Sequence, residues 1–98
     1  MFDLTGKTAL VAGGAGYLGL PVCTKLAEQG ANVVIADINA ERAAEAADEV
    51  SKTVPGSRVA ALRMDIANEQ SIKEVVGKTV EKFGNLNIMV NATTVAAG

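Results

Sequence analysis

The chain has 98 residues, of which 49% are hydrophobic and 20% charged, a size that allows one small domain and excludes two. Nine basic and eleven acidic residues give a net charge of −2, which excludes the basic surface that nucleic-acid binding needs. Histidine is absent, so catalysis and metal sites that depend on imidazole are excluded, and we predict no metal site.

The compartment is indicated by the single cysteine, Cys23, which permits no internal disulfide and suits a reducing environment. The first residues lack the apolar core of a secretory signal, and no apolar run approaches the ~20 residues of a membrane helix. We therefore expect a soluble cytoplasmic protein with no membrane partner.

Four short apolar segments rich in β-branched residues predict buried strands: 8–12, 32–36, 58–64 and 86–90. Their starts are 24, 26 and 28 residues apart. This spacing fits a helical crossover and is too long for a hairpin, so the sheet is predicted to be parallel.

Apolar residues at helical spacing lie between the first three predicted strands. The first helix is predicted to end at Gly30, a residue type typical of the C′ position, and its apolar stripe comprises Leu18, Val22, Cys23, Leu26 and Ala27. The second, from about Ala40 to Thr53, ends before Pro55. Its acidic residues are interpreted as a solvated face: Glu41, Glu45, Asp48 and Glu49.

A third helix precedes the last predicted strand, with Asn68 as its expected N-cap. Two pairs at i,i+4 spacing, Glu69 with Lys73 and Glu74 with Lys78, are expected to support it. Its buried face is predicted to comprise Ile72, Val75, Val76, Thr79, Val80 and Phe83.

This alternation of strands and helices predicts an α/β fold, a Rossmann-type doubly wound parallel sheet with strand order 3-2-1-4. The strand at 86–90 would then lie at an open edge, with one helix alone on its face of the sheet. We therefore expect residues 1–98 to be the N-terminal part of a single domain that is incomplete in this sequence.

A glycine-rich segment joins the first predicted strand to the first predicted helix. Gly14, Gly16 and Gly19 satisfy G-x-G-x-x-G in the strand-to-helix context that this motif requires. The free N–H groups at a helix N-terminus bind a pyrophosphate only where no Cβ obstructs the approach. The segment therefore predicts a dinucleotide site.

An acidic residue, Asp37, ends the second predicted strand, 18 residues after Gly19, where a carboxylate can accept hydrogen bonds from an adenosine ribose. That carboxylate would repel a 2′-phosphate, so the sequence favours NAD over NADP. Arg42 is the nearest cation and is interpreted as a surface residue. Sites for S-adenosylmethionine and FAD use a similar pattern and remain alternatives.

Further polar residues follow the last two predicted strands. Asp65 and Ile66 come after the third strand and Asn91 after the fourth, so all three belong to the carboxyl edge where such sheets bind ligands. Asp65 is equally compatible with capping the third helix.

Several segments together resemble the short-chain dehydrogenase/reductase family: 2–11, the glycine loop, Asp65-Ile66 and 83–91. The resemblance implies that Gly13, Gly16 and Gly19 hold the pyrophosphate, with backbone N–H groups of Tyr17 and Leu18. It further implies that Asp37 binds the ribose, that Asp65 and Ile66 bind the adenine, and that Asn91 forms the pocket floor. A complete enzyme of this family would transfer hydride between NAD and an alcohol or ketone, and would be expected to be a homo-oligomer.

The chain departs from the family pattern in three places. Ala12 replaces a usual Thr, Tyr17 stands where the second glycine is common, and the usual Asn-Asn-Ala-Gly reads Asn-Ala-Thr-Thr at 91–94. Gly13, Gly16 and Gly19 have the spacing of the sugar-nucleotide epimerase and dehydratase branch, which stays an alternative.

The family's catalytic Ser and Tyr-x-x-x-Lys have no counterpart in this sequence. The only tyrosine is Tyr17, and Pro21 stands four residues after it. We therefore assign no catalytic residue and expect the chain alone to be inactive. A stand-alone nucleotide-binding or interaction module is the remaining alternative.

Overall fold

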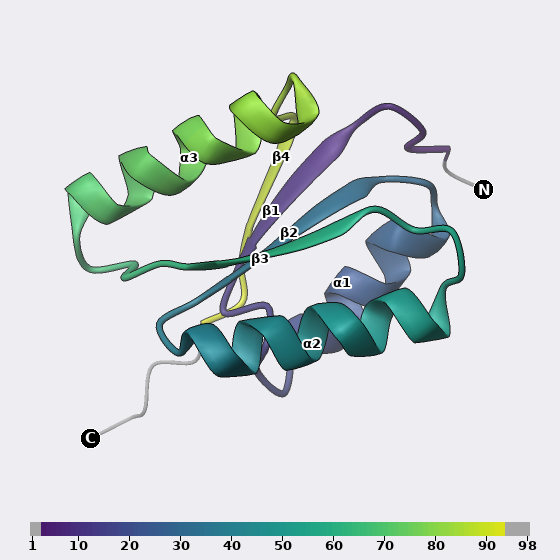
Figure 1. Ribbon diagram of the computed structural model, residues 1–98, viewed down its shortest axis with the longest axis horizontal. Helices are drawn as coiled ribbons and strands as arrows, with labels where there is room; N and C mark the ends of the chain where they lie inside the picture. Colours follow the sequence, from purple (N-terminus) through teal and green to yellow (C-terminus); the bar gives the residue numbers. More distant parts are fainter. Residues whose placement is uncertain (1–2, 94–98) are drawn as a thin grey trace.

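The computed structural model describes residues 3–93, in which strands and helices alternate along the chain (Figure 1). The elements are β1 (Thr8–Ala12), α1 (Gly19–Glu28), β2 (Asn32–Asp37), α2 (Ala40–Thr53), β3 (Val59–Arg63), α3 (Glu69–Phe83) and β4 (Ile88–Asn91). All strand pairs are parallel, in the order β3-β2-β1-β4. The α/β class and the predicted strand order are therefore confirmed.

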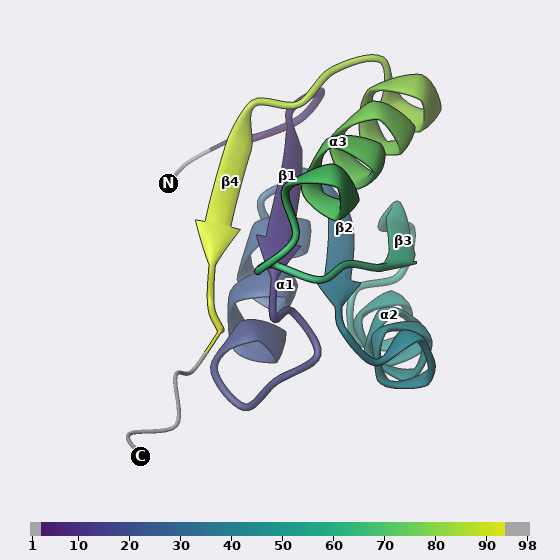
Figure 2. The same ribbon diagram turned by 90° about the vertical axis from the view of Figure 1, so that its left-hand side faces the viewer.

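Three layers arise because the central strands, apart from Asp37 at the end of β2, are buried and successive side chains point to opposite faces. Val11, Val33 and Ile35 pack beneath α1 and α2, whereas Leu10 and Val34 face α3. Figure 2 shows α1 and α2 on one side of the sheet and α3 on the other.

Strand β4 lies at the edge of the sheet and pairs only with β1 among residues 3–93. This agrees with the prediction that the last strand of this part of the chain lies at an open edge. Strand β4 begins at Ile88, two residues later than predicted. The preceding asparagines hold this connection in place: the Asn87 amide oxygen accepts from the Thr8 N–H at 2.9 Å, and Asn85 Nδ2 donates to the Gly6 carbonyl at 2.8 Å.

The predicted helix ends are confirmed by their hydrogen bonds. Asn68 caps α3 by accepting from the Ser71 N–H at 3.0 Å. Gly30 follows α1 at φ +93°, and the Gly30 and Ala31 N–H groups bond to Ala27 and Leu26 carbonyls in a Schellman arrangement.

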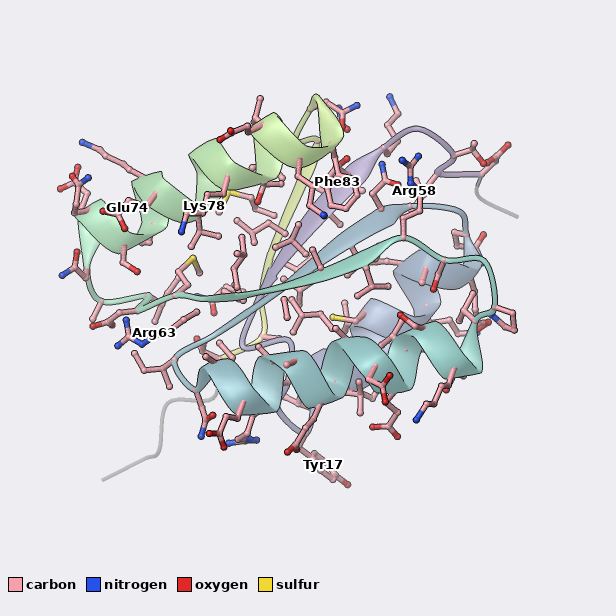
Figure 3. The ribbon with its side chains drawn as sticks, in the orientation of Figure 1. Tyr17, Arg58, Arg63, Glu74, Lys78 and Phe83 are labelled. Carbon is pink, nitrogen blue, oxygen red and sulfur yellow. The ribbon has the colours of Figure 1, made fainter. Side chains whose placement is uncertain are left out.

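Only one of the two predicted ion pairs of α3 forms. Lys73 lies 3.4 Å from Glu69, while within the described part of the chain no ion pair joins Glu74 to Lys78. Both of these latter side chains are exposed on α3 (Figure 3), where such a pair contributes little stability.

Two residues of the predicted apolar stripes are exposed instead of buried. Leu18, 55% exposed, is the N-cap residue of α1 and precedes the helix. Val80, 42% exposed, lies on α3, which packs over β1 and β2 and leaves the side towards β4 uncovered (Figure 2). The predicted stripes were therefore wrong at these two positions. Leu18 lies before the helix begins, and helical spacing does not reveal how much of the α3 surface the sheet covers.

Cys23 is fully buried on α1, with its Sγ 3.8 Å from the carbonyl oxygen of Gly14. Burial raises the pKa of this thiol from 9.0 to about 12, because the surrounding apolar side chains do not solvate a thiolate. The side chain therefore acts as core packing and not as a nucleophile.

Because the pKa of Cys23 is raised in the folded state, we expect the free energy of unfolding to decrease as the pH rises above 9.0. Above the ordinary pKa of 9.0 the unfolded state loses the Cys23 proton, whereas the folded state keeps it until about pH 12. The free energy of unfolding should drop across this range by up to about 1.4 kcal/mol per pH unit relative to Cys23→Ala. Urea unfolding of both proteins at several pH values measures this difference, and rapid thiol labelling of the folded chain would contradict it.

Candidate nucleotide-binding site

The loops that follow the strands converge at the carboxyl edge of the sheet, where two adjoining pockets open. One, about 290 Å³, lies over the ends of β1, β2 and β3, and the other, about 440 Å³, lies over the glycine loop. They share four lining residues: Gly13, Asp37, Ile38 and Thr93. Together they form one cleft along the carboxyl ends of the strands, where sheets of this kind bind ligands.

Three glycines of the loop between β1 and α1 are required by close approaches. Gly13 has φ +74°, and a Cβ there would lie 2.9 Å from the Thr93 nitrogen. A Cβ on Gly14 would lie 2.9 Å from Cγ2 of Ile35, and one on Gly19 would lie 2.1 Å from the Gly13 carbonyl oxygen. The approach at Gly16 is looser, 3.2 Å to the same oxygen.

The turn that these glycines permit leaves backbone donors free at the start of α1. The N–H groups of Ala15, Tyr17, Leu18 and Gly19 have no hydrogen-bond acceptor among residues 3–93. No acidic residue stands in the first turn of α1. Free N–H groups and the positive end of the helix dipole make this an anion-binding arrangement.

Asp37 ends β2 and lines both pockets. Its Oδ1 accepts from the Asn39 N–H at 3.0 Å, which holds the turn into α2. Its second oxygen, Oδ2, has no hydrogen-bond donor within the described part of the chain. The carboxylate therefore both shapes the turn and keeps an acceptor for a ligand hydroxyl.

Asp65 and Ile66, which follow β3, line the smaller pocket together with Met64. The Asp65 carboxylate accepts from the Ala67 N–H at 3.0 Å, in a turn that precedes α3. Asn68 caps that helix, so the alternative of Asp65 as the cap was wrong. Ile66 is 40% exposed and offers an apolar surface at the pocket mouth.

Asn91 is not brought into the cleft with the other predicted residues. It pairs with Ala12 at the end of β4, and its Oδ1 accepts from the Thr93 N–H at 3.1 Å. Ala92 and Thr93 line the cleft instead. Leu18 and Gly19 line neither pocket; Leu18 is the N-cap residue and Gly19 the first residue of α1.

Several lining residues were not predicted from the sequence, among them Ile38, Arg42 and Thr93. Ile38 and Thr93 line both pockets, and Arg42, interpreted as a surface residue, lines the larger one. Arg42 is exposed, but its Nη2 reaches the Ala15 carbonyl oxygen at 3.4 Å. The only sequence signal for this placement is that Arg42 lies three residues after the N-cap Asn39, in the first turn of α2, next to the glycine loop that contains Ala15.

A larger hollow of about 730 Å³ lies in the groove between α1 and α2, lined by residues such as Tyr17, Pro21 and Glu49. It contains neither Asp37 nor Asp65, and side chains of the helices dominate its wall. We place the candidate site in the cleft at the sheet edge, because the carboxylates of Asp37 and Asp65 lie there together with Gly13 and Gly16 of the glycine loop.

Residues 3–93 contain neither a metal-binding cluster nor a membrane-spanning helix. No group of three or more cysteine, histidine or acidic side chains is arranged to hold a metal ion there. No helix of that part is long and apolar enough to cross a membrane.

A family model for short chain dehydrogenases matches residues 7–98. Among curated proteins, the chain is 40% identical over 87 residues to 2,5-dichloro-2,5-cyclohexadiene-1,4-diol dehydrogenase of Sphingobium indicum, covering 89% of this chain and 33% of that protein. It is 38% identical to a short chain dehydrogenase/reductase of Macrophomina phaseolina, covering 91% of this chain and 50% of that protein. An uncharacterized oxidoreductase of Bacillus subtilis is 32% identical, with 91% and 13% covered.

Solved structures give the same result. A hydroxysteroid dehydrogenase from Escherichia coli superposes with a TM-score of 0.85 at 34% identity, over 91% of this chain and 37% of that one. A short chain dehydrogenase from Mycobacterium smegmatis superposes with a TM-score of 0.89 at 29% identity, over 99% and 42%. NAD⁺-bound xylitol dehydrogenase superposes at 0.81 with 28% identity, over 88% and 32%. The chain thus spans half or less of the length of each of these relatives.

Proposed function

The chain belongs to the short-chain dehydrogenase family, and from this premise we propose that it binds NAD, in preference to NADP, along the carboxyl edge of its sheet. The observation that carries the proposal is the cleft in which Gly13 and Asp37 lie beside the free N–H groups at the start of α1. A relative of known structure, the xylitol dehydrogenase, is described as NAD⁺-bound.

The glycine loop fits a dinucleotide, because its glycines carry no Cβ that would obstruct the approach of the pyrophosphate. We propose that the loop from Gly13 to Gly19 binds the pyrophosphate through its free N–H groups, including those of Tyr17 and Leu18. Gly16 keeps the loop surface low where the phosphates would approach. The positive end of the α1 dipole adds to this attraction.

The adenosine end is assigned to the smaller pocket. There the free oxygen of Asp37 would accept from the ribose hydroxyls, while Ile66 would cover one face of the adenine and Asp65 would lie at its edge. Asn91, predicted to form the pocket floor, would act from outside the cleft, by holding the turn in which Thr93 lines it.

The preference for NAD follows from charge at the ribose. A phosphate on the 2′ oxygen of the ribose would lie next to the Asp37 carboxylate, and the two negative charges would repel each other. Ile38 next to it carries no charge that would neutralise the phosphate.

We propose that the complete protein is an oxidoreductase that transfers hydride between the nicotinamide and an alcohol or ketone. Relatives named diol, hydroxysteroid and xylitol dehydrogenases support this substrate class. Nicotinamide supplies the hydride chemistry when bound. Residues 1–98 would contribute the nucleotide-binding site of that enzyme. Their one tyrosine, Tyr17, is 93% exposed in the glycine loop, and Pro21 stands four residues after it where a catalytic pair would need a lysine. We therefore expect that these residues by themselves do not catalyse the reaction.

We further expect the complete protein to be a cytoplasmic homo-oligomer with no nucleic-acid partner. The single cysteine, Cys23, suits a reducing compartment, and the net charge of −2 does not favour a nucleic-acid partner. The oligomeric state stays a prediction from the family resemblance.

The test is a calorimetric titration of NAD⁺ and NADP⁺ into the purified chain, with a thermal melt of the same sample. NAD⁺ is expected to bind more tightly and to raise the melting temperature, since a ligand that binds only the folded state stabilises it. S-adenosylmethionine and FAD serve as competing ligands. Tighter binding of either, or no nucleotide binding by a cooperatively folded chain, would overturn the proposal.

A further inference from the structure

The phenol side chain of Tyr17 has no part in the proposed pyrophosphate site, which uses only the backbone N–H of this residue. The side chain is 93% exposed, more than any other large hydrophobic side chain that is exposed in residues 3–93. Figure 3 shows the ring projecting outward from the glycine loop, away from the sheet. Folding therefore leaves this aromatic ring almost without packing partners and free to contact a ligand.

The ring stands at the boundary between the nucleotide cleft and the neighbouring groove. Tyr17 lines both the pocket over the glycine loop and the hollow between α1 and α2, as do Gly16 and Arg42. Its backbone φ is not positive, so a side chain is tolerated at a position where glycine is common in the family. Exposed side chains change rotamer within picoseconds to nanoseconds, so the ring can turn from solvent towards either hollow.

We infer that the Tyr17 side chain covers the pyrophosphate of the bound nucleotide, with its hydroxyl donating to a phosphate oxygen. The inference rests on the proposed function. Because the N–H of Tyr17 would itself bind the pyrophosphate, the side chain of the same residue starts beside it. A hydroxyl that donates to an anion forms a charge-assisted hydrogen bond, and a ring over the phosphates would shield the N–H bonds beneath it from water.

The groove offers a competing role for this ring. Its wall includes Leu20 and Pro21, which line that hollow and neither pocket of the cleft. A ring that packs against them would steady the glycine loop without touching a phosphate. Pro21 is exposed, so its replacement by alanine tests this role at little cost to the core.

The test compares NAD⁺ binding by the unsubstituted chain, Tyr17→Phe and Tyr17→Ala in calorimetric titrations. Phenylalanine keeps the ring and loses the hydroxyl, so the dissociation constant should rise about threefold, whereas alanine loses both and should raise it about tenfold. Melting temperatures without nucleotide should stay unchanged, because the side chain is exposed. Pro21→Ala should leave the dissociation constant unchanged.

Smaller probes show which part of the nucleotide the ring contacts. Tyr17→Ala should weaken binding of 5′-ADP and leave binding of adenosine, which has no phosphate, unchanged. Tyr17 is the only tyrosine of the chain, so nitration by tetranitromethane reports on the exposure of this ring. NAD⁺ and 5′-ADP should slow the nitration, whereas adenosine should not.

An unchanged dissociation constant in Tyr17→Ala, or nitration that NAD⁺ does not slow, would overturn the inference. Equal weakening of 5′-ADP and adenosine would also overturn it, as would a loss of affinity in Pro21→Ala as large as that in Tyr17→Ala, because both indicate a ring that only steadies the loop. These outcomes leave NAD⁺ binding, and with it the proposed function, in place. Absence of any nucleotide binding by the folded chain overturns both.

Discussion

Replacing Gly19 with alanine is expected to destabilise the chain by about 3 kcal/mol or more and to abolish nucleotide binding. The added Cβ would lie 2.1 Å from the carbonyl oxygen of Gly13 and 2.7 Å from Cα of Gly14. Both neighbours are backbone atoms, so relief requires α1 to move away from the end of β1. That movement would open the turn that presents the free N–H groups.

Gly77→Ala is the matched control for this substitution. Gly77 lies within α3, and no heavy atom stands within 4 Å of its added Cβ. Alanine there should stabilise the chain by about 0.5 to 1 kcal/mol through helix propensity. Thermal and urea unfolding of the two variants should therefore differ in sign. A Gly19→Ala protein that melts like Gly77→Ala would show that the loop is not packed as described.

Replacing Asp37 with alanine is expected to weaken NAD⁺ binding by a factor of about 10 to 100, with a smaller effect on stability. The estimate corresponds to loss of the hydrogen bonds between a charged acceptor and the ribose hydroxyls. The structural cost is limited to the contact of Oδ1 with the Asn39 N–H. Calorimetric titration gives the affinity, and a urea melt gives the stability.

Two further variants separate ligand chemistry from charge. Asp48→Ala removes a carboxylate of equal charge from the exposed face of α2 and should leave NAD⁺ affinity unchanged. Adding Ile38→Arg to Asp37→Ala should shift the preference towards NADP⁺, because a cation then replaces an anion at the ribose. Unchanged NAD⁺ affinity in Asp37→Ala would mean that the carboxylate does not bind the ribose.

The sheet was predictable because each central strand is buried on both faces and therefore appears in sequence as a continuous apolar run. Residues 32–36 form such a run, and in the structure strand β2 extends one residue further, to Asp37. The start of β4 was less predictable. Side-chain hydrogen bonds from Asn85 and Asn87 hold residues that hydrophobicity alone assigned to the strand.

The site was predictable to the extent that its residues follow strands directly. Gly13, Asp37, Asp65 and Ile66 meet in one cleft for this reason. Arg42 and Thr93 were not assigned to it, since their places depend on how α2 begins and how the chain turns after β4. Gly13 also depends on that turn, because its close neighbour is Thr93, 80 residues away in sequence.

By itself, the sequence determined the order of strands and helices, the parallel sheet and the residues at its carboxyl edge. These follow from periodicity and turn chemistry, which act between residues close along the chain. The tertiary structure decided which glycines are sterically required, which stripe residues stay exposed, and that Arg42 faces the same pocket as Asp37. Those properties depend on distances between elements, and such distances are set only when the helices pack against the sheet.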